Sequence, residues 1–574
     1  MTQFEYLKSV KNDLNFDFKS RRSVVFGTHG LVSSSQPLAC EAGLQILRKG
    51  GNAADAAVAT ALALNVTEPC SCGIGGDCFV LFYSNEKKEV FSLNGSGRAP
   101  KNLTLDKLRQ MGIQGQQIPF HNLNSVTVPG AVDAFLQTIQ LFGSGKVSRE
   151  EIFHSAIELA ENGYPVSEIT ANSWQKSEKI LRETSPNGND MLRNGQAPKA
   201  GEIMKMPLLA KTFREIISKG RDGFYKGYVA QAIVDLIESQ GGLMTLEDLE
   251  EHQSTLVQPI SISYDLKNVR IWECPPNGQG LVALLALGIL QQLQKQNRIP
   301  SLDTFEHNSS KYLHLLIESL RLAFADGQQF ITDPQFQQIP IEQLLSDEYL
   351  SKRSQLINLE SANQHVEHGS PLNSSDTVYF TVTDQQGNAC SFIFSNYTGF
   401  GTGALPKNCG FTLQNRGANF ILEEGHPNCI EPRKRPYHTI IPSMITHSDG
   451  DLCASFGVMG GFMQPQGHLQ VFLNLLHFNM NVQQALDTPR FCIQPSVSNG
   501  TDQKNESIVF IEDGISEQVI QELKDLGHHV QLIQGPDRAT FGRGQIILKV
   551  QNDDQKLVWA AGSDPRGDGH AHGW

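Results

Sequence analysis

The sequence lacks any long apolar segment. No run of about 18 consecutive apolar residues occurs, and the first 22 residues, MTQFEYLKSVKNDLNFDFKSRR, contain no apolar stretch of signal-peptide length. These absences argue against a membrane-spanning helix and against export. We therefore expect a cytoplasmic protein without a membrane partner.

The sequence also lacks the charge of a nucleic-acid binder and the cysteine density of a disulfide scaffold. Its formal net charge is −13, which disfavours a nucleic-acid partner. Ten cysteines in 574 residues indicate reduced thiols rather than a disulfide framework. With 39% hydrophobic and 19% charged residues and no low-complexity run, the composition is that of a large globular enzyme or binding protein.

Ligand sets for a metal ion or a phosphate are scarce. Cys70, Cys72 and Cys78 have no zinc-type histidine or cysteine spacing around them, so we interpret them as small core residues. The glycine-rich turn Gly73-x-Gly75-Gly76 precedes an apolar strand rather than a helix, which disfavours a phosphate loop. The histidines considered as ligands show no spacing with a carboxylate; they are His426, His438, His468, His570 and His572. The prediction is no metal and no cofactor.

What the sequence does contain is a distinctive hairpin. From Thr377 to Thr383, threonine and tyrosine alternate with valine and phenylalanine, a period of two that predicts a strand beginning after Asp376. The turn residues of Asp384 to Asn388 follow, and Ala389 to Phe394 returns as a second strand. Most threonines in strands have only a packing role. Whether Thr377 has a chemical role must therefore be judged from the motifs around it.

Several further motifs accompany the hairpin in a fixed order. They are G-G-N-A-x-D-A-A at 50–57, F-G-x-G at 400–403, K-R-P at 434–436, Gly-Gly at 460–461 and GSDPRGDG at 562–569. Together they resemble the γ-glutamyltranspeptidase family of N-terminal nucleophile hydrolases. The matching segments extend over residues 27–569, nearly the whole chain.

The resemblance implies an α+β fold, a four-layer αββα sandwich built from a precursor that cuts itself. It divides the chain into an N-terminal extension (1–26), a large subunit (27–376) and a small subunit (377–574). Together these form one N-terminal nucleophile hydrolase domain. The two cleaved chains would remain a heterodimer, and a dimer of heterodimers stays open. The polar, aperiodic segment from Ser354 to Asp376 fits a tether before the cleavage site.

The resemblance also implies a catalytic group. Cleavage between Asp376 and Thr377 would free the α-amine of Thr377, which has a reference pKa of roughly 8 and can serve as base for its own hydroxyl. Ser395 stands where relatives have a second threonine that touches the nucleophile. The family places its oxyanion hole on a glycine pair, and the resemblance assigns that role to Gly460 and Gly461 here. Backbone amides between a strand and a helix can stabilise the negative charge that develops on a substrate oxygen.

The donor-binding positions differ from those of relatives that process glutathione. In those relatives, a set of polar residues holds the α-amino and α-carboxylate groups of the γ-glutamyl donor. In this chain the same positions carry Tyr397, Arg416, Asn419, His438 and Thr439. Asn419 in place of aspartate removes the partner of an ammonium group, while Arg416 adds positive charge. Arg98 follows two residues after the position of the family's carboxylate-binding arginine, which is Ser96 here. Arg98, Arg416 and His438 are therefore candidates for a replacement carboxylate clamp.

Three hypotheses remain open from the sequence. The first is an autoprocessed γ-glutamyl hydrolase or transferase that acts on glutathione-like amides, with water, an amino acid or a peptide as acceptor. The second keeps the Thr377 nucleophile and changes the donor to another small amide, as in acylase and amidohydrolase branches of the family. The third is a member that never cuts and serves as a binding protein, and the presence of Thr377, Ser395 and the glycine pair argues against it.

Overall fold

The computed structural model describes residues 22–363, 376–494, 507–550 and 556–574. Residues 1–21 of the predicted N-terminal extension and residues 364–375 of the predicted tether lie outside these ranges. Within them, none of the helices is long and apolar enough to cross a membrane.

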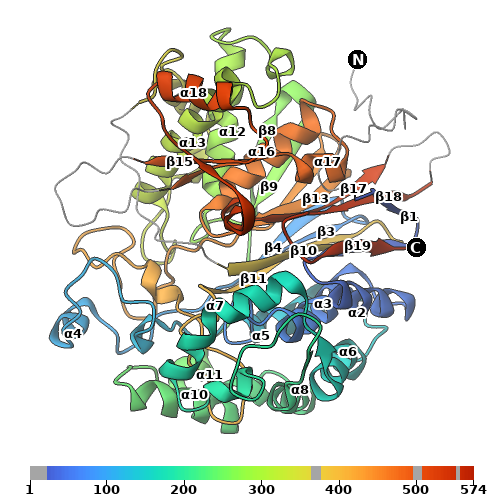
Figure 1. The fold of residues 1–574 in the computed structure, drawn as a ribbon, viewed down its shortest axis with the longest axis vertical. Coiled ribbons are helices and arrows are strands. Elements are labelled where there is room, and N and C mark those ends of the chain that lie inside the picture. Colours follow the sequence, from blue (N-terminus) through green and yellow to red (C-terminus); the bar gives the residue numbers. More distant parts are fainter. Residues whose placement is uncertain (1–21, 364–375, 495–506, 551–555) are drawn as a thin grey trace.

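Two seven-stranded sheets lie face to face in the middle of the molecule (Figure 1). The sheet that contains the candidate nucleophile Thr377, called the nucleophile sheet below, has the order β19 (His570–Gly573), β2 (Gly30–Ser34), β10 (Asp376–Asp384), β11 (Ala389–Tyr397), β3 (Asp77–Ser84), β4 (Glu89–Gly95) and β7 (Thr255–Val257). The facing sheet has the order β1 (Val25–Gly27), β18 (Val558–Ser563), β17 (Arg543–Val550), β13 (Leu452–Met459), β12 (Ser443–His447), β9 (Val269–Glu273) and β8 (Ile260–Tyr264). Every pairing within these two sheets is antiparallel.

The side chains of β10 divide between two cores, as its alternating sequence predicts. Tyr379 packs with residues of the facing sheet in the core between the sheets. Val378, Phe380 and Val382 point the other way, into the core beneath the nucleophile sheet. Because successive strand residues face opposite sides, Thr377 shares the inner face with Tyr379 and Thr381.

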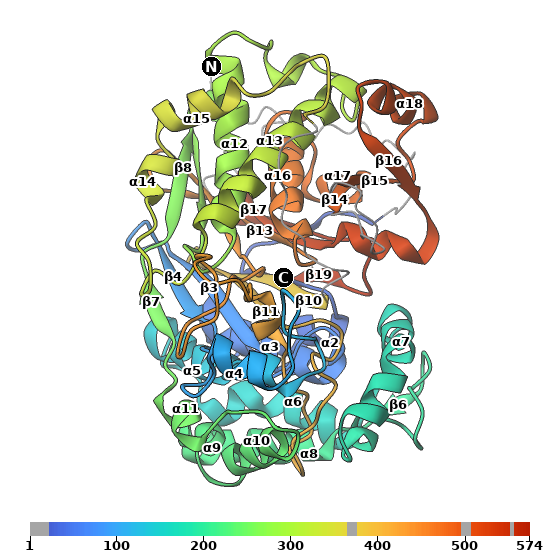
Figure 2. The same cartoon turned by 90° about the vertical axis from the view of Figure 1, so that its left-hand side faces the viewer.

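Helices cover the outer face of each sheet and complete four layers (Figures 1 and 2). Those packed on the nucleophile sheet and around its core include α2 (Pro37–Arg48), α3 (Ala53–Thr67), α5 (Ala131–Phe142), α6 (Arg149–Asn162), α7 (Glu168–Thr184), α8 (Pro207–Lys219), α9 (Asp222–Tyr225) and α10 (Gly227–Ser239). Those on the facing sheet include α12 (Gly280–Lys295), α13 (Ser310–Phe330), α15 (Asp347–Ser354), α16 (Met463–Leu476) and α17 (Val482–Asp487). The predicted αββα sandwich is confirmed.

The remaining elements lie at the periphery. Short helices are α4 (Leu105–Gln110), α11 (Leu246–Glu251), α14 (Ile341–Leu344) and α18 (Glu517–Asp525). A three-stranded sheet joins β14 (Phe491–Gln494), β15 (Ile508–Glu512) and β16 (His529–Ile533), and a two-stranded one joins β5 (Tyr164–Pro165) and β6 (Ile203–Met204).

The alanine-rich helix α3 shows how the glycine-rich motif shapes the layer beneath the nucleophile. Asn52 caps it by accepting from the amides of Ala54 and Asp55, while the Asp55 carboxylate accepts from the Asn52 amide. Every residue of α3 is buried, as the small side chains predict. The helix packs closely on α2 and also contacts β10, so the strand that begins near Thr377 rests on a rigid support.

The apolar sequence predicts strands at Phe411 to Leu413 and at Ile440 to Thr446, and both differ in the structure. Residues Phe411 to Leu413 form no strand, because their backbone bonds join a loop: the Leu413 amide donates to Ala404 O, and the Thr402 amide donates to Leu413 O. The strand predicted from Ile440 begins only at Ser443, since the amide of Ile441 donates to the side chain of Gln464 instead of a ladder partner.

Candidate active site

Thr377 lies near the start of β10 and is fully buried. Its Oγ1 donates a hydrogen bond to Oγ of Ser395, at 3.1 Å, on the neighbouring strand β11. The register between these strands shifts between Asp376 and Val378, which is where the candidate nucleophile sits. Two residues of β11, Ser395 and Asn396, oppose Thr377 at this point, so the extra residue lies on β11 and β10 keeps its alternation.

Ser395 is held in a fixed position beside Thr377. Its Oγ also accepts from the backbone amide of Tyr397, at 2.8 Å. Tyr397 adopts φ of +80°, a conformation that costs a non-glycine residue of the order of 1 to 3 kcal/mol. The fold therefore maintains a strained turn at the end of β11 that directs one amide toward the Ser395 hydroxyl.

The glycine pair follows β13, the strand that faces β10 across the inner core. Thr381 Oγ1 donates to Ser455 Oγ at 2.6 Å, and the Tyr379 ring occupies the space where a side chain on Gly457 would lie. Continuing this two-residue step, we infer that Thr377 lies beside the end of β13, where Gly460 follows.

Backbone amides at this point suit a developing oxyanion. Gly460 and Gly461 have φ of +127° and +60°, and α16 begins two residues later at Met463. Within the described ranges, no hydrogen bond is donated by the amide of either glycine to another protein group. Exposed amides before a helix N-terminus can stabilise negative charge on a substrate oxygen.

Arg416 brings a buried positive charge to the site. It is fully buried at the start of a short 3-10 helix, Arg416–Asn419. One terminal nitrogen donates to Thr439 Oγ1 at 2.7 Å, and the guanidinium lies over the Tyr397 ring, 4.3 Å from its centroid. Nε and the other terminal nitrogen have no hydrogen-bond partner in the described structure. Burial lowers the pKa of Arg416 to about 10, so it stays charged at neutral pH.

Asp77 and His438 form the neighbouring buried pair. His438 Nε2 donates to Asp77 Oδ2 at 2.9 Å, while its Nδ1 accepts from the amide of Ile440. Burial and the charge of Arg416 lower the pKa of His438 to about 3, against the opposing effect of Asp77, so the ring is neutral. The other Asp77 oxygen accepts from the amides of Gly97 and Gly130 and from the side chain of Gln414.

Asn419 and Gln279 hold the backbone around these groups. Asn419 donates through its side chain to Tyr437 O at 3.1 Å, so it braces the segment that carries His438. The side-chain amide of Gln279 donates to both Thr439 O and Gly461 O, at 2.5 and 2.8 Å. Gln279 thus links Thr439, the hydrogen-bond partner of Arg416, to Gly461 of the glycine pair.

Arg98 lies apart from this group. Its hydrogen bonds go to Gln253 O and to the side chain of Gln335, at 3.4 and 3.5 Å. The structure therefore brings Arg416, His438, Thr439 and Tyr397 together but does not join Arg98 to them.

Sequence reasoning missed Asp77 and Gln279. Asp77 closes the glycine-rich turn that was interpreted only as a strand entrance, and Gln279 lies in the loop before α12. The same signal could have revealed both residues. Each is a polar residue next to glycines and an apolar segment, and each is fully buried, where a polar group needs a partner.

An αββα sandwich with two stacked antiparallel sheets at its centre is the fold of the N-terminal nucleophile hydrolases. Comparison with known proteins gives the family within that class. The gamma-glutamyltranspeptidase family profile matches residues 39–574, and the chain belongs to that family of hydrolases and transferases.

Individual relatives are similar over nearly their whole length. The glutathione hydrolase-like YwrD proenzyme of Bacillus subtilis is 36% identical, covering 96% of this chain and 99% of the relative. The oxamate amidohydrolase proenzyme of Klebsiella pneumoniae is 29% identical, covering 95% and 99%. The crystal structure of a cephalosporin acylase from Bacillus halodurans has a TM-score of 0.86 and 39% identity, covering 98% of this chain and 99% of that one.

Proposed function

We propose that this chain cuts itself between Asp376 and Thr377 and then uses Thr377 to hydrolyse or transfer the acyl group of a small amide, with γ-glutamyl amides such as glutathione as the first candidates. The observation that carries the proposal is the Thr377 hydroxyl, buried near the start of β10 and hydrogen-bonded to Ser395. Two cleaved chains would form the active heterodimer.

Self-cleavage requires only groups already in place. The Thr377 Oγ attacks the carbonyl carbon of Asp376 and passes its proton to the departing backbone nitrogen, so the C–N bond breaks and an ester forms. Water then opens the ester, leaving a carboxylate on Asp376 and a free α-amine and hydroxyl on Thr377. Ser395 holds the hydroxyl in position because its own oxygen is fixed by the Tyr397 amide.

Turnover uses the amine that cleavage creates. The α-amine, with a reference pKa of roughly 8, takes the proton from Thr377 Oγ as this oxygen attacks the donor amide. The amides of Gly460 and Gly461 stabilise the oxyanion. The leaving amine departs with the proton, and water or an acceptor amine then resolves the Thr377 ester.

Arg416 supports a donor with a carboxylate. A buried guanidinium with two unpaired nitrogens is energetically costly, and a carboxylate is the group whose geometry satisfies both. The α-carboxylate of a γ-glutamyl group would serve, and so would the terminal carboxylate of a simpler diacid amide.

A second candidate donor lacks the ammonium group. Asp77 is the acid beside Arg416, and its oxygens already accept from two amides and the side chains of Gln414 and His438. Asn419 offers no charge. An α-ammonium group would therefore lack an anionic partner here, which favours a desamino monoamide. The similarity to an oxamate amidohydrolase and a cephalosporin acylase supports this alternative.

The test compares intact mass and donor turnover in matched threonine variants. Thr377→Ala should leave an uncut 63.3 kDa chain without activity. Thr383→Ala, on the same strand and face and with a hydroxyl that has no partner in the described structure, should be cut and active. A cut, active Thr377→Ala enzyme would refute the proposal.

The donor is then tested on the cut protein. Glutathione turnover at least as fast as that of a glutaryl amide supports the γ-glutamyl assignment, whereas turnover of the glutaryl amide alone supports the desamino donor. A cut protein that accepts neither contradicts both donor assignments while leaving self-cleavage standing.

A further inference from the structure

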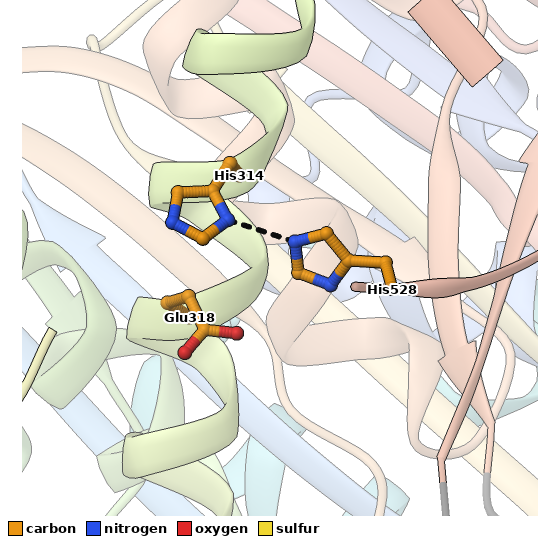
Figure 3. A group of neighbouring side chains, drawn as sticks. All are labelled: His314, Glu318 and His528. Carbon is orange, nitrogen blue, oxygen red and sulfur yellow. Dashed lines mark hydrogen bonds between the residues drawn. The ribbon is translucent and has the colours of Figure 1, made fainter. Parts of the chain in front are cut away.

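A second group of chemistry-bearing side chains lies away from Thr377, on the outer side of the facing sheet. His314 and Glu318 lie one turn apart on α13, and His528 lies between α18 and β16 (Figure 3). All three are buried, and one ligand-capable atom from each lies within 4.8 Å of the others. Buried histidines and a carboxylate that converge in this way are the donor set of a transition-metal site.

His314 is oriented as a metal ligand is. Its Nε2 faces the backbone carbonyl of Asn358 at 2.8 Å, so this nitrogen carries the hydrogen. The lone pair therefore lies on Nδ1, which points at His528 Nε2, 2.8 Å away. A histidine whose other nitrogen donates to a backbone carbonyl has its tautomer and ring plane fixed for coordination.

His528 has an incomplete set of partners. Its Nε2 meets His314, but its Nδ1 is buried and has no hydrogen-bond partner in the described structure. A neutral imidazole binds a metal through the lone pair of one ring nitrogen. Moving the remaining proton from Nε2 to Nδ1 exposes the Nε2 lone pair without a change of charge.

Glu318 supplies the anionic ligand. Histidine and glutamate four residues apart lie on the same face of a helix. One Glu318 oxygen accepts from Arg321 at 2.7 Å, and the other accepts from the backbone amide of Asn363 at 3.0 Å. Each carboxylate oxygen has a further lone pair available for an ion.

We propose that His314, Glu318 and His528 bind one divalent transition-metal ion, with zinc the best match to two imidazoles and a carboxylate. The two facing nitrogens would separate from 2.8 Å to about 3.3 Å, the span across a tetrahedral ion with Zn–N bonds of about 2.0 to 2.1 Å. Water completes the fourth position. Arg321 opposes the ion's charge, so we expect weaker binding than at a closed cysteine-rich zinc site.

The proposed ion would connect segments on both sides of the cleavage point. His314 and Glu318 precede Asp376, and His528 follows it. The ligand partners Asn358 and Asn363 belong to the segment that leads toward the cut, and the amide of Ala362 donates to Leu526 O beside His528. If the chain is cut as proposed above, the ion cross-links the two products; metal binding itself does not depend on that cut.

The experiment uses the full-length protein, stripped with EDTA and dialysed against zinc or cobalt(II). We expect one zinc ion per chain by elemental analysis, an intense visible absorption with cobalt(II) that reports tetrahedral nitrogen coordination, and a higher unfolding temperature with zinc. His528→Ala should lose all three signals, and Glu318→Gln should bind at least tenfold more weakly.

The chain offers a matched control. His154 and Glu158 on α6 have the same four-residue spacing and lie 3.5 Å apart, but both are exposed, and no third ligand from the described part of the chain joins them. His154→Ala should therefore keep the full metal signal. Native protein that binds no zinc or cobalt(II) overturns the proposal. So does equal binding by a His528→Ala or Glu318→Gln variant whose circular dichroism shows that it is folded.

Discussion

Replacing Arg416 by methionine should separate donors by their carboxylate. Methionine fills similar space without charge, so the substitution removes the two unpaired guanidinium nitrogens that we assign to the donor. Each hydrogen bond to a charged group contributes about 1.5 to 3 kcal/mol. The loss of both corresponds to about 3 kcal/mol or more, and kcat/KM for a carboxylate donor should fall by about a hundredfold or more.

The assay compares two anilide donors of equal carbon length. Glutaryl p-nitroanilide carries the terminal carboxylate and pentanoyl p-nitroanilide does not, so Arg416→Met should slow the first and spare the second. Arg98→Met is the matched control, because Arg98 bonds Gln253 and Gln335 outside the site, and it should change either rate less than threefold. An equal loss for both donors would refute the assignment and indicate that Arg416 only supports the fold.

Two further predictions follow from the same contacts. Gln279→Met leaves the carbonyls of Thr439 and Gly461 without their hydrogen-bond donor. The kcat/KM should therefore fall at least tenfold for every amide substrate, equivalent to about 1.4 kcal/mol. A loss confined to substrates with a carboxylate would contradict this positioning role. The folded-state pKa of His438 is lowered to about 3, below the unfolded value of about 6.5, so the stability it contributes is present above pH 6.5 and is lost as the pH falls toward 3. His438→Gln should therefore flatten the dependence of unfolding free energy on pH in that window, measured by urea titration, and an unchanged slope would count against a neutral buried His438.

Single elements could be predicted because their signals are local, whereas the four-layer arrangement was predicted from the resemblance to the family. The period of two from Thr377 to Thr383 and the capped, alanine-rich stretch after Asn52 each determine an element without help from the rest of the chain. The segment from Phe411 to Leu413 could not be assigned in this way. Its apolar residues resemble a strand, but its amides bond to a loop that only the tertiary structure brings near.

The sequence proposes a candidate nucleophile but does not predict the charge balance around it. Thr377, Ser395 and the glycine pair follow from motif order, whereas the pairing of Asp77 with His438 joins residues 361 positions apart. No local pattern reports such a contact. The separation of Arg98 from Arg416 is equally non-local, because it depends on the loops that carry Gln253 and Gln335.

The charges around Arg416 connect the fold to the choice of donor. Asp77 raises the pKa of Arg416 and so offsets part of its burial, but the hydrogen bonds of its carboxylate go to two amides, Gln414 and His438. Within the described structure the guanidinium therefore bonds Thr439 but no carboxylate, and its Nε and one terminal nitrogen remain available. A donor carboxylate completes this arrangement, whereas a donor ammonium would add a second buried cation beside Arg416 with only the neutral Asn419 to meet it. The same geometry thus suits the carboxylate of either proposed donor but offers no counter-charge to the ammonium of a γ-glutamyl group, and the ratio of glutaryl to γ-glutamyl turnover decides between the two donors.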